Sequence, residues 1–448
     1  MGLEEILVIA MFASFMGLLL LGFPVAWSLA GIGLLFAVLG YVLVEHFDAN
    51  LWFTWDGTIG VLDARIYGIV ANELMVALPL FIFMGIMLDR SGIAERLMHS
   101  LVRVLGPLRG GYAVTVVVVG ILLAASTGIV GASVALLGML SIGPMLQANY
   151  NKSLAVGTAC SVGTLGILIP PSIMLVLMAD RLGTSEASVG KLFMAGVIPG
   201  IMLGLVLMIA IYIVARIKKL PALPRASFRE WLRAAREAFW GLLLMVIILG
   251  GIYSGMFTPT EAAAVAAVYS AFVALFVYKD ITLRDCPKVL LESGKLSIML
   301  MFIIANAMLF AHVLTTEQIP KAITAWVIEA GLQPWMFLLV VNIVLLVAGA
   351  FMEPSAIILI LAPILFPIAM QLGIDPIHLG IIMVVNMEIG LITPPVGLNL
   401  FVASAVTGMP VTQVIRAVLP WLALMLSFLV IITYVPSISL ALPNWLGM

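Results

Sequence analysis

Charged side chains are scarce in this sequence: Lys, Arg, Asp and Glu together make up 10 % of its 448 residues. Apolar residues make up 64 %, whereas an average soluble domain has about 45–50 % apolar and about 25 % charged residues. A water-soluble globule could not bury so much apolar surface, which excludes a soluble enzyme, a nucleic-acid-binding protein and a disordered regulator. The net charge of −1 offers no basic surface for a polyanion. The composition therefore predicts a polytopic helical membrane protein in contact with lipid.

Cysteine and histidine are also rare. Cys160 and Cys286 lie in different segments and predict no disulfide framework, and the four histidines form no metal-ligand pattern. The sequence has no HExxH, no GxSxG and no His/Asp pair within an apolar span, which argues against an intramembrane enzyme. It also lacks GxxxxGK[ST], which argues against ATP as an energy source. No Lys or Arg precedes the first apolar run, so we expect no cleaved signal peptide. We expect no enzymatic activity and no cofactor.

Long apolar stretches are abundant, and about 20 apolar residues suffice for a helix to cross a bilayer. Residues 6–44 are long enough for two spans, with Gly22 and Pro24 between them. Two stretches, 110–151 and 330–374, have polar centres, and composition alone allows each to be either a re-entrant hairpin or two complete spans. The other expected crossings are 66–89, 153–179, 192–215, 238–256, 260–278, 296–315, 376–404 and 417–436.

The basic residues predict the orientation, because cytoplasmic loops of membrane proteins are enriched in Lys and Arg. The connector 216–236 carries seven basic residues and one acid. With these crossings, 17 of the 21 basic residues fall on the connector's side, which is therefore expected to be cytoplasmic. Both termini are then expected outside. Trp231, Trp240 and the neighbouring arginines predict an amphipathic helix along the cytoplasmic interface.

The two halves of the chain, 1–224 and 225–448, resemble each other weakly and in the same order. Each half holds five crossings, and an odd number makes the two repeats inverted, as in many secondary transporters. This architecture favours alternating access over a passive channel. The matching segments are 22–31 with 256–265, 81–88 with 302–309, 126–137 with 347–359, and 166–172 with 390–396.

Two of the expected crossings are interrupted by a pair of prolines, Pro170-Pro171 and Pro394-Pro395. Proline removes a backbone donor and clashes with the preceding helical turn, so each pair should unwind its helix. Unwound backbone at membrane depth is tolerated only inside protein or beside a polar cavity. Its free carbonyl groups suit a small cation, and the half-helix N-termini suit an anion.

Five segments resemble the large membrane subunit, of the DctM type, of tripartite ATP-independent periplasmic (TRAP) transporters, and the likeness extends over roughly 5–435. The resemblance implies an all-α elevator-type transporter with two discontinuous helices, and it makes 110–151 and 330–374 re-entrant hairpins. The segments are STGIVGAS (126–133), GTLGILIPPSIMLVL (163–177), FTPTEAAAV (257–265), FMEPSA (351–356) and GLITPPVGLNLFV (390–402).

The resemblance also implies a function, namely sodium-coupled import of a small organic anion of the carboxylate class across the bacterial inner membrane. The expected partners are a periplasmic substrate-binding protein and a small four-helix membrane subunit, which would be a separate chain. Sodium would be the coupling ion, and both termini would be periplasmic. The alternative is a stand-alone sodium/dicarboxylate carrier of related architecture.

By the same resemblance, the hairpin tips and broken helices hold sodium, and substrate lies between the two sites. Among acidic residues in apolar context, Glu353 lies at an expected hairpin tip, Glu388 just before a break, and Glu261 at an expected helix start. The implied sodium-binding residues are Ser126, Gly128, Gly131, Ser133, Gly163, Thr164, Gly349, Glu353, Ser355, Gly390 and Thr393. The implied substrate-binding residues are Pro170, Pro171, Ser172, Pro394, Pro395, Gly397 and Asn399.

Overall fold

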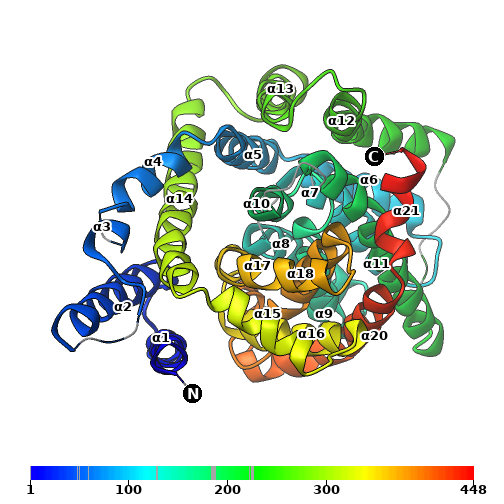
Figure 1. The fold of residues 1–448 in the computed structure, drawn as a ribbon. Coiled ribbons are helices and arrows are strands. Elements are labelled where there is room, and N and C mark those ends of the chain that lie inside the picture. Colours follow the sequence, from blue (N-terminus) through cyan, green and yellow to red (C-terminus); the bar gives the residue numbers. More distant parts are fainter. Residues whose placement is uncertain are drawn as a thin grey trace.

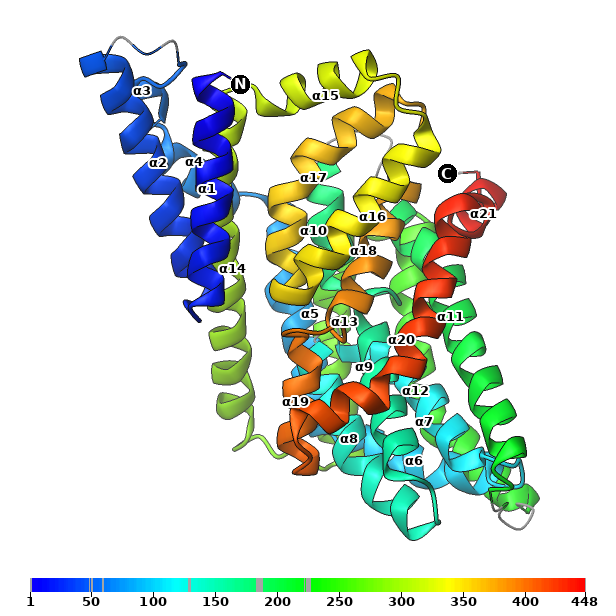
Figure 2. The same ribbon diagram turned by 90° about the horizontal axis from the view of Figure 1, so that it is seen from below.

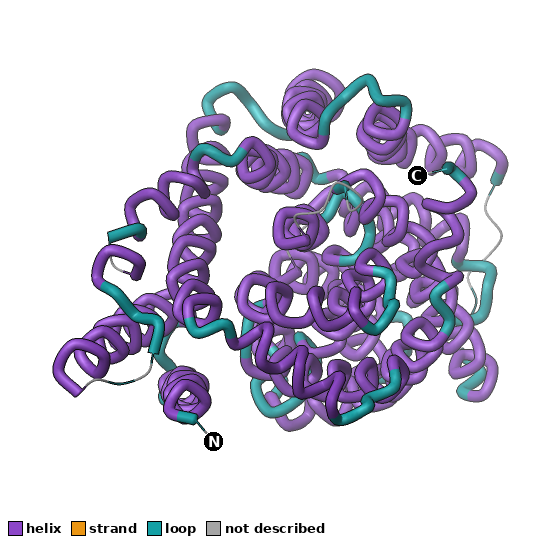
Figure 3. The backbone as a smooth tube through the Cα atoms, in the orientation of Figure 1, coloured by secondary structure: helices purple, strands orange, loops and turns teal. Residues whose placement is uncertain are grey.

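A computed structural model describes residues 2–47, 49, 51–58, 60–127, 130–182, 188–220, 222 and 227–447 of the chain. Throughout this part, every regular element is a helix (Figure 3). Nine of the described helices have at least 18 residues and are apolar enough to cross a membrane. The prediction of an all-α polytopic membrane protein is confirmed.

The two spans expected within residues 6–44 are present as α1 and α2, but the next expected crossing is divided. Gly22, with φ +87°, lies between α1 and α2, as the sequence predicts. The expected crossing 66–89 is divided, because the Asn72 side chain accepts a hydrogen bond of 2.9 Å from the Leu74 N–H and starts a new helix there. The bounds are α1 (Leu3–Leu20), α2 (Val25–Phe47), α3 (Trp55–Thr58), α4 (Leu62–Val70), α5 (Glu73–Arg90) and α6 (Ile93–Leu105).

Two crossings of the second half, α12 and α14, each begin ten residues before the expected apolar span. Their charged first turns are helical, which a search for charge-free stretches cannot detect. In the turn before α14, Asp285 accepts hydrogen bonds from the Thr282 hydroxyl (2.6 Å) and N–H (3.0 Å), and these lower the pKa of Asp285. The bounds are α11 (Val189–Ile217), α12 (Phe228–Tyr253), α13 (Pro259–Phe272), the π-helical η2 (Val273–Tyr278), α14 (Cys286–Thr316), α15 (Ile319–Glu329), α20 (Val411–Tyr434) and α21 (Ser437–Trp445).

The expected hairpins and broken crossings form an inner group of helices. In Figure 1, helices α14, α5, α13 and α12 form an arc along two sides of this group. Figure 2 shows α16 and α17 running from the upper end of the molecule to its middle, where the chain turns between them. The inner helices are α7 (Gly111–Thr127), α8 (Val130–Gln147), α9 (Lys152–Gly163), η1 (Thr164–Ile167), α10 (Ile173–Leu182), α16 (Pro334–Phe351), α17 (Pro354–Gln371), α18 (Pro376–Gly390) and α19 (Leu398–Thr407).

Both ends of the chain lie toward the same end of the molecule, with α15 lying across that end (Figure 2). Helix α6 and the end of α11, where the basic connector begins, lie at the opposite end. The termini and the connector are therefore separated along the direction of the upright helices. Which of the two ends faces the cytoplasm stays a prediction from the distribution of Lys and Arg.

Candidate transport site

A cavity of about 470 Å³ lies between the arc and the inner group. Ile82 of α5 and three residues of α14 form its wall on the side of the arc. Elements from both halves form the opposite wall. The lining residues are Ile82, Gly131, Ile167, Ile173, Met174, Leu296, Met299, Leu300, Glu353, Pro354, Leu391, Leu398, Asn399, Phe401 and Val402.

Four helices begin at this cavity. Gly131, Ile173, Pro354 and Leu398 line it, and each is the first or second residue of its helix: α8, α10, α17 and α19 respectively. The first N–H groups of a helix have no partner within it, and the helix dipole places partial positive charge there. The arrangement therefore suits an anion, although no Lys or Arg is among the described residues that line the cavity.

Two polar side chains also reach the cavity. The Asn399 side chain is 1 % exposed, and its Nδ2 has no hydrogen-bond acceptor within the described part of the chain. Its backbone N–H donates to the Leu391 carbonyl oxygen at 3.1 Å, which holds the start of α19 against the end of α18. Glu353 accepts a hydrogen bond from the Ser355 hydroxyl. Asn399 can therefore donate to a ligand oxygen, and Glu353 places an acidic group beside it.

The first expected sodium site lies where hairpin helix α8 meets the broken crossing. A Cβ added at Gly163 would lie 2.9 Å from the Val134 Cα, so the two backbones are in close contact there. Thr164, the next residue, is fully buried, and Ser133 is 3 % exposed. Gly128 and the side chain of Ser126 lie outside the described residues.

At the second expected sodium site, the broken crossing touches the first helix of its hairpin, α16. A Cβ added at Gly390 would lie 2.6 Å from the Gly349 Cα, so α16 and α18 touch at these glycines. The Thr393 hydroxyl donates to the Ile389 carbonyl oxygen at 2.8 Å, within its own turn. Ser355 is fully buried against Glu353. The structure therefore brings Gly349 against Gly390 and Ser355 against Glu353, and their binding of sodium stays a prediction.

Most of the expected substrate-binding residues shape the breaks and do not line the cavity. Ser172 is buried, and its hydroxyl donates to the Ile167 carbonyl oxygen at 2.5 Å. Gly397 has φ +49°, and its N–H donates to the Ala350 carbonyl oxygen at 3.1 Å. Asn399 alone of the expected substrate-binding residues is among the described lining residues, which do not include the prolines Pro170, Pro171, Pro394 and Pro395.

Sequence reasoning missed the apolar wall that the arc contributes. Leu296, Met299 and Leu300 lie on one face of α14, and no motif distinguishes them from other apolar helix residues. The sequence places Glu388 just before a break but assigns it to neither site. It is fully buried and accepts a hydrogen bond from the Thr164 hydroxyl at 3.0 Å. Glu388 lies at the same distance before its proline pair as Thr164 does before the other pair, and this match was the sequence signal that could have linked the two residues.

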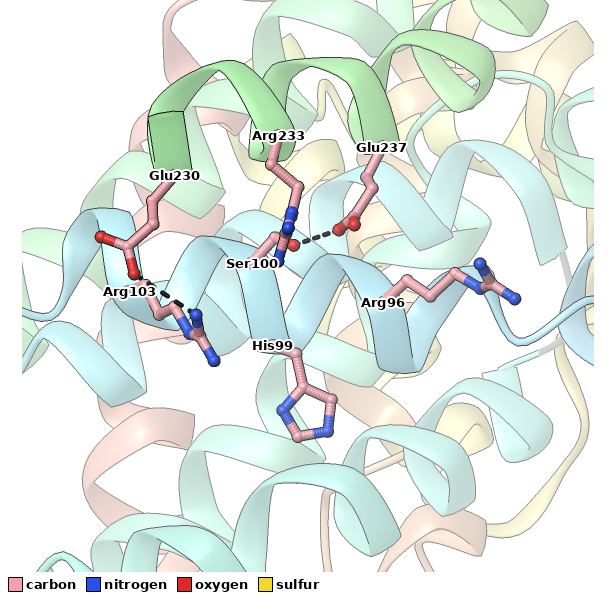
Figure 4. A pocket seen from close by; sticks show the side chains of 7 residues that line it. All are labelled: Arg96, His99, Ser100, Arg103, Glu230, Arg233 and Glu237. Carbon is pink, nitrogen blue, oxygen red and sulfur yellow. Dashed lines mark hydrogen bonds and ion pairs between the residues drawn. The ribbon is translucent and has the colours of Figure 1, made fainter. Parts of the chain in front are cut away.

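A second, polar pocket of about 210 Å³ lies between α6 and α12 (Figure 4). One ion pair and one hydrogen bond join the two helices there: Arg103 lies 3.3 Å from Glu230, and the Ser100 hydroxyl donates to Glu237. Figure 4 shows Arg233 extending from α12 over the same space. These contacts fasten the amphipathic α6 to the first turns of α12. The expected interfacial helix is thus the beginning of the crossing α12, and the pocket contains none of the expected transport residues.

The helical fold and the central cavity, at which four helices begin, define a polytopic helical membrane protein with an internal binding cavity. The YdaH transporter of Alcanivorax borkumensis has the same fold, with a TM-score of 0.62, 16 % sequence identity, and coverage of 85 % of this chain and 88 % of that chain.

Residues 12–438 match the family described as "Tripartite ATP-independent periplasmic transporter, DctM component". The chain is 66 % identical over 387 residues to the C4-dicarboxylate TRAP transporter large permease protein DctM of Pseudomonas aeruginosa, covering 86 % of this chain and 90 % of the relative. It is 38 % identical over 367 residues to the isethionate TRAP transporter permease protein DctMQ of Oleidesulfovibrio alaskensis, covering 82 % of this chain and 57 % of that longer protein. The chain therefore belongs to the DctM family and is a TRAP transporter large permease subunit.

Proposed function

We propose that this subunit imports a C4-dicarboxylate by sodium-coupled secondary transport, with the dianion bound in the central cavity. The observation that carries the proposal is the convergence of four helix N-termini on a cavity lined by no described Lys or Arg. Helix N-termini favour anions by about 0.3–1 kcal/mol each at exposed sites and by more when partly buried. The 66 % identity to a C4-dicarboxylate permease supports this substrate class.

Bound cations would supply the charge balance that the lining lacks. A dianion beside Glu353, in a cavity whose described lining residues include no Lys or Arg, needs compensating positive charge. Helices α9–η1 and α18 end beside the cavity, where their last carbonyl groups carry partial negative charge. Sodium ions held at the two hairpin contacts would supply that positive charge, which makes substrate binding depend on sodium.

The proposal includes the two partners of a tripartite system. The longer DctMQ relative supports a small membrane subunit beside the large one, and the family description supports a periplasmic component. The inner group of helices would then move as an elevator against the arc, because the cavity lies on the boundary between the two. We place the protein in the bacterial inner membrane, with both termini in the periplasm.

The test is uptake of a C4-dicarboxylate into liposomes containing the large and small subunits. We expect uptake only with an inward sodium gradient and the cognate binding protein, and no effect of ATP. Replacing Asn399 by Ala should raise the KM, because an amide that can donate to a substrate carboxylate is lost. The exposed Asn444→Ala, on α21, is the matched control and should match the parent. Uptake that persists without the sodium gradient, or that requires ATP, would overturn the proposal.

A further inference from the structure

A side-chain hydrogen bond joins the broken crossing of the first half to that of the second. The Thr164 hydroxyl, at the start of η1, lies 3.0 Å from the Glu388 Oε1 in α18. Both residues are 0 % exposed. The other carboxyl oxygen of Glu388, Oε2, is buried and has no hydrogen-bond partner in the described part of the chain.

The two residues occupy equivalent positions in the proposed repeat. Thr164 lies six residues before Pro170, and Glu388 lies six residues before Pro394. Their separation of 224 residues is also the separation of the two proline pairs. In a pair of units related by two-fold symmetry, a residue can contact its own equivalent only at the axis. The Thr164–Glu388 contact therefore marks the pseudo-two-fold axis between the repeats.

The axis position places Glu388 between the two expected sodium sites. Thr164 directly follows Gly163, which touches hairpin helix α8. Gly390 is two residues beyond Glu388 and touches Gly349 of the other hairpin. Glu388 does not line the cavity, so it can act on substrate only through other groups.

No described Lys, Arg or His balances this carboxylate, and an isolated buried charge is unfavourable without a cation partner. We propose that Glu388 is a carboxylate shared by both sodium sites, which raises the sodium affinity of each through its charge. The proposal rests on the sodium coupling proposed above. Because a charge acts over several ångströms in a low-dielectric interior, one carboxylate at the axis can serve a site in each repeat.

The test measures sodium binding without transport. The purified complex of large and small subunits is unfolded by heat in detergent at increasing sodium chloride, with choline chloride keeping the ionic strength constant. Glu388→Gln keeps the shape and the acceptor for Thr164 but removes the charge. It is compared with its parent in two backgrounds, Ser133→Ala and Ser355→Ala, each of which is predicted to weaken one of the two sites.

We expect Glu388→Gln to raise the half-saturating sodium concentration roughly tenfold in both backgrounds, and Glu388→Asp to restore part of the affinity. Glu317→Gln is the matched control, because Glu317 is also buried and accepts one hydrogen bond, from the Trp52 N–H at 2.9 Å. That variant should keep the parental sodium curve.

The outcomes separate this inference from the proposed function. If Glu388→Gln changed the half-saturating sodium concentration in only one background, the proposal that Glu388 serves both sodium sites would be overturned. Unchanged sodium curves in both backgrounds would reduce Glu388 to a structural hydrogen-bond acceptor and leave sodium coupling intact. A parental complex that sodium does not stabilise would overturn both the inference and the sodium coupling on which it rests.

Discussion

At the scale of single residues, glycines set how closely the hairpins approach the broken helices. Gly349 and Gly390 face each other across α16 and α18, with less space than a methyl group needs. Helices in membranes commonly use small residues where their backbones meet. Here the contact also keeps the C-terminal ends of α16 and α18 together, and the second cation site is expected at these ends.

We predict that Gly390→Ala destabilises the protein by about 1–3 kcal/mol, because the added Cβ would overlap the Gly349 backbone. The midpoint of thermal unfolding in detergent measures this change. Gly294→Ala on α14 is the control, since nothing lies within 4 Å of the Cβ it adds. Equal midpoints for the two variants would contradict the close contact.

The serines Ser133 and Ser355 are predicted to contribute one oxygen each to a cation. A hard cation needs several oxygen ligands, so an incomplete shell weakens its binding. Replacing either serine by alanine should raise the sodium concentration for half-maximal uptake while expression stays near normal. If the hydroxyls only bridge helices, the loss is a stability effect of about 0.6 kcal/mol and the sodium curve is unchanged. Uptake measured against sodium at fixed substrate decides between the two roles.

At the scale of elements, side-chain hydrogen bonds at helix ends fix where several helices begin. The sequence Thr258-Pro-Thr-Glu261 predicts the start of a helix, and α13 begins at Pro259. The Thr258 side chain accepts from the Glu261 N–H at 3.2 Å, and Glu261 accepts from the Thr258 N–H at 2.8 Å. Glu261 is therefore a capping residue at the helix start where the sequence places it.

Removing this cap should cost about 1 kcal/mol, because the first N–H groups of α13 lose an acceptor. The variant is Thr258→Ala, and the measurement is reversible unfolding in mixed micelles. Thr258→Ser retains the hydroxyl and should stay near the parent. A Thr258→Ala protein as stable as the parent would show that the cap contributes nothing measurable.

At the scale of the whole molecule, the basic residues and the positions of the termini give one consistent orientation. The N- and C-termini lie toward one end, and the basic connector begins at the other (Figure 2). The excess of Lys and Arg predicts that the connector's end is cytoplasmic. The orientation decides from which side a binding protein can deliver substrate.

Single cysteines at positions 2, 226 and 447, in a background without Cys160 and Cys286, test this orientation. An impermeant thiol reagent added outside should label positions 2 and 447 but not 226, because 226 lies in the basic connector. All three should react after the membrane is permeabilised, which controls for accessibility. Labelling of 226 alone from outside would reverse the orientation.

Much of the fold could be predicted from the sequence, because a bilayer restricts a chain to a few structures. Apolar runs and proline pairs located the crossings and both breaks. Charged helix turns were missed in α12 and α14, since hydropathy detects the part of a helix in lipid and not the turns beyond it. Gly349 and Gly390, which the sequence assigns to one expected sodium site, touch in the structure, whereas the α14 wall of the cavity carries no motif.

By itself, the sequence determined that this chain is a helical membrane protein, where its helices break, and to which family it belongs. These properties follow from local composition and from short contiguous motifs, which can be recognised without the structure. Only the tertiary structure decided that four helix N-termini meet at one cavity, that most of the expected prolines do not line it, and that Thr164 touches Glu388. Contacts between residues 224 positions apart depend on how the two halves pack, and packing is a property of the folded chain as a whole.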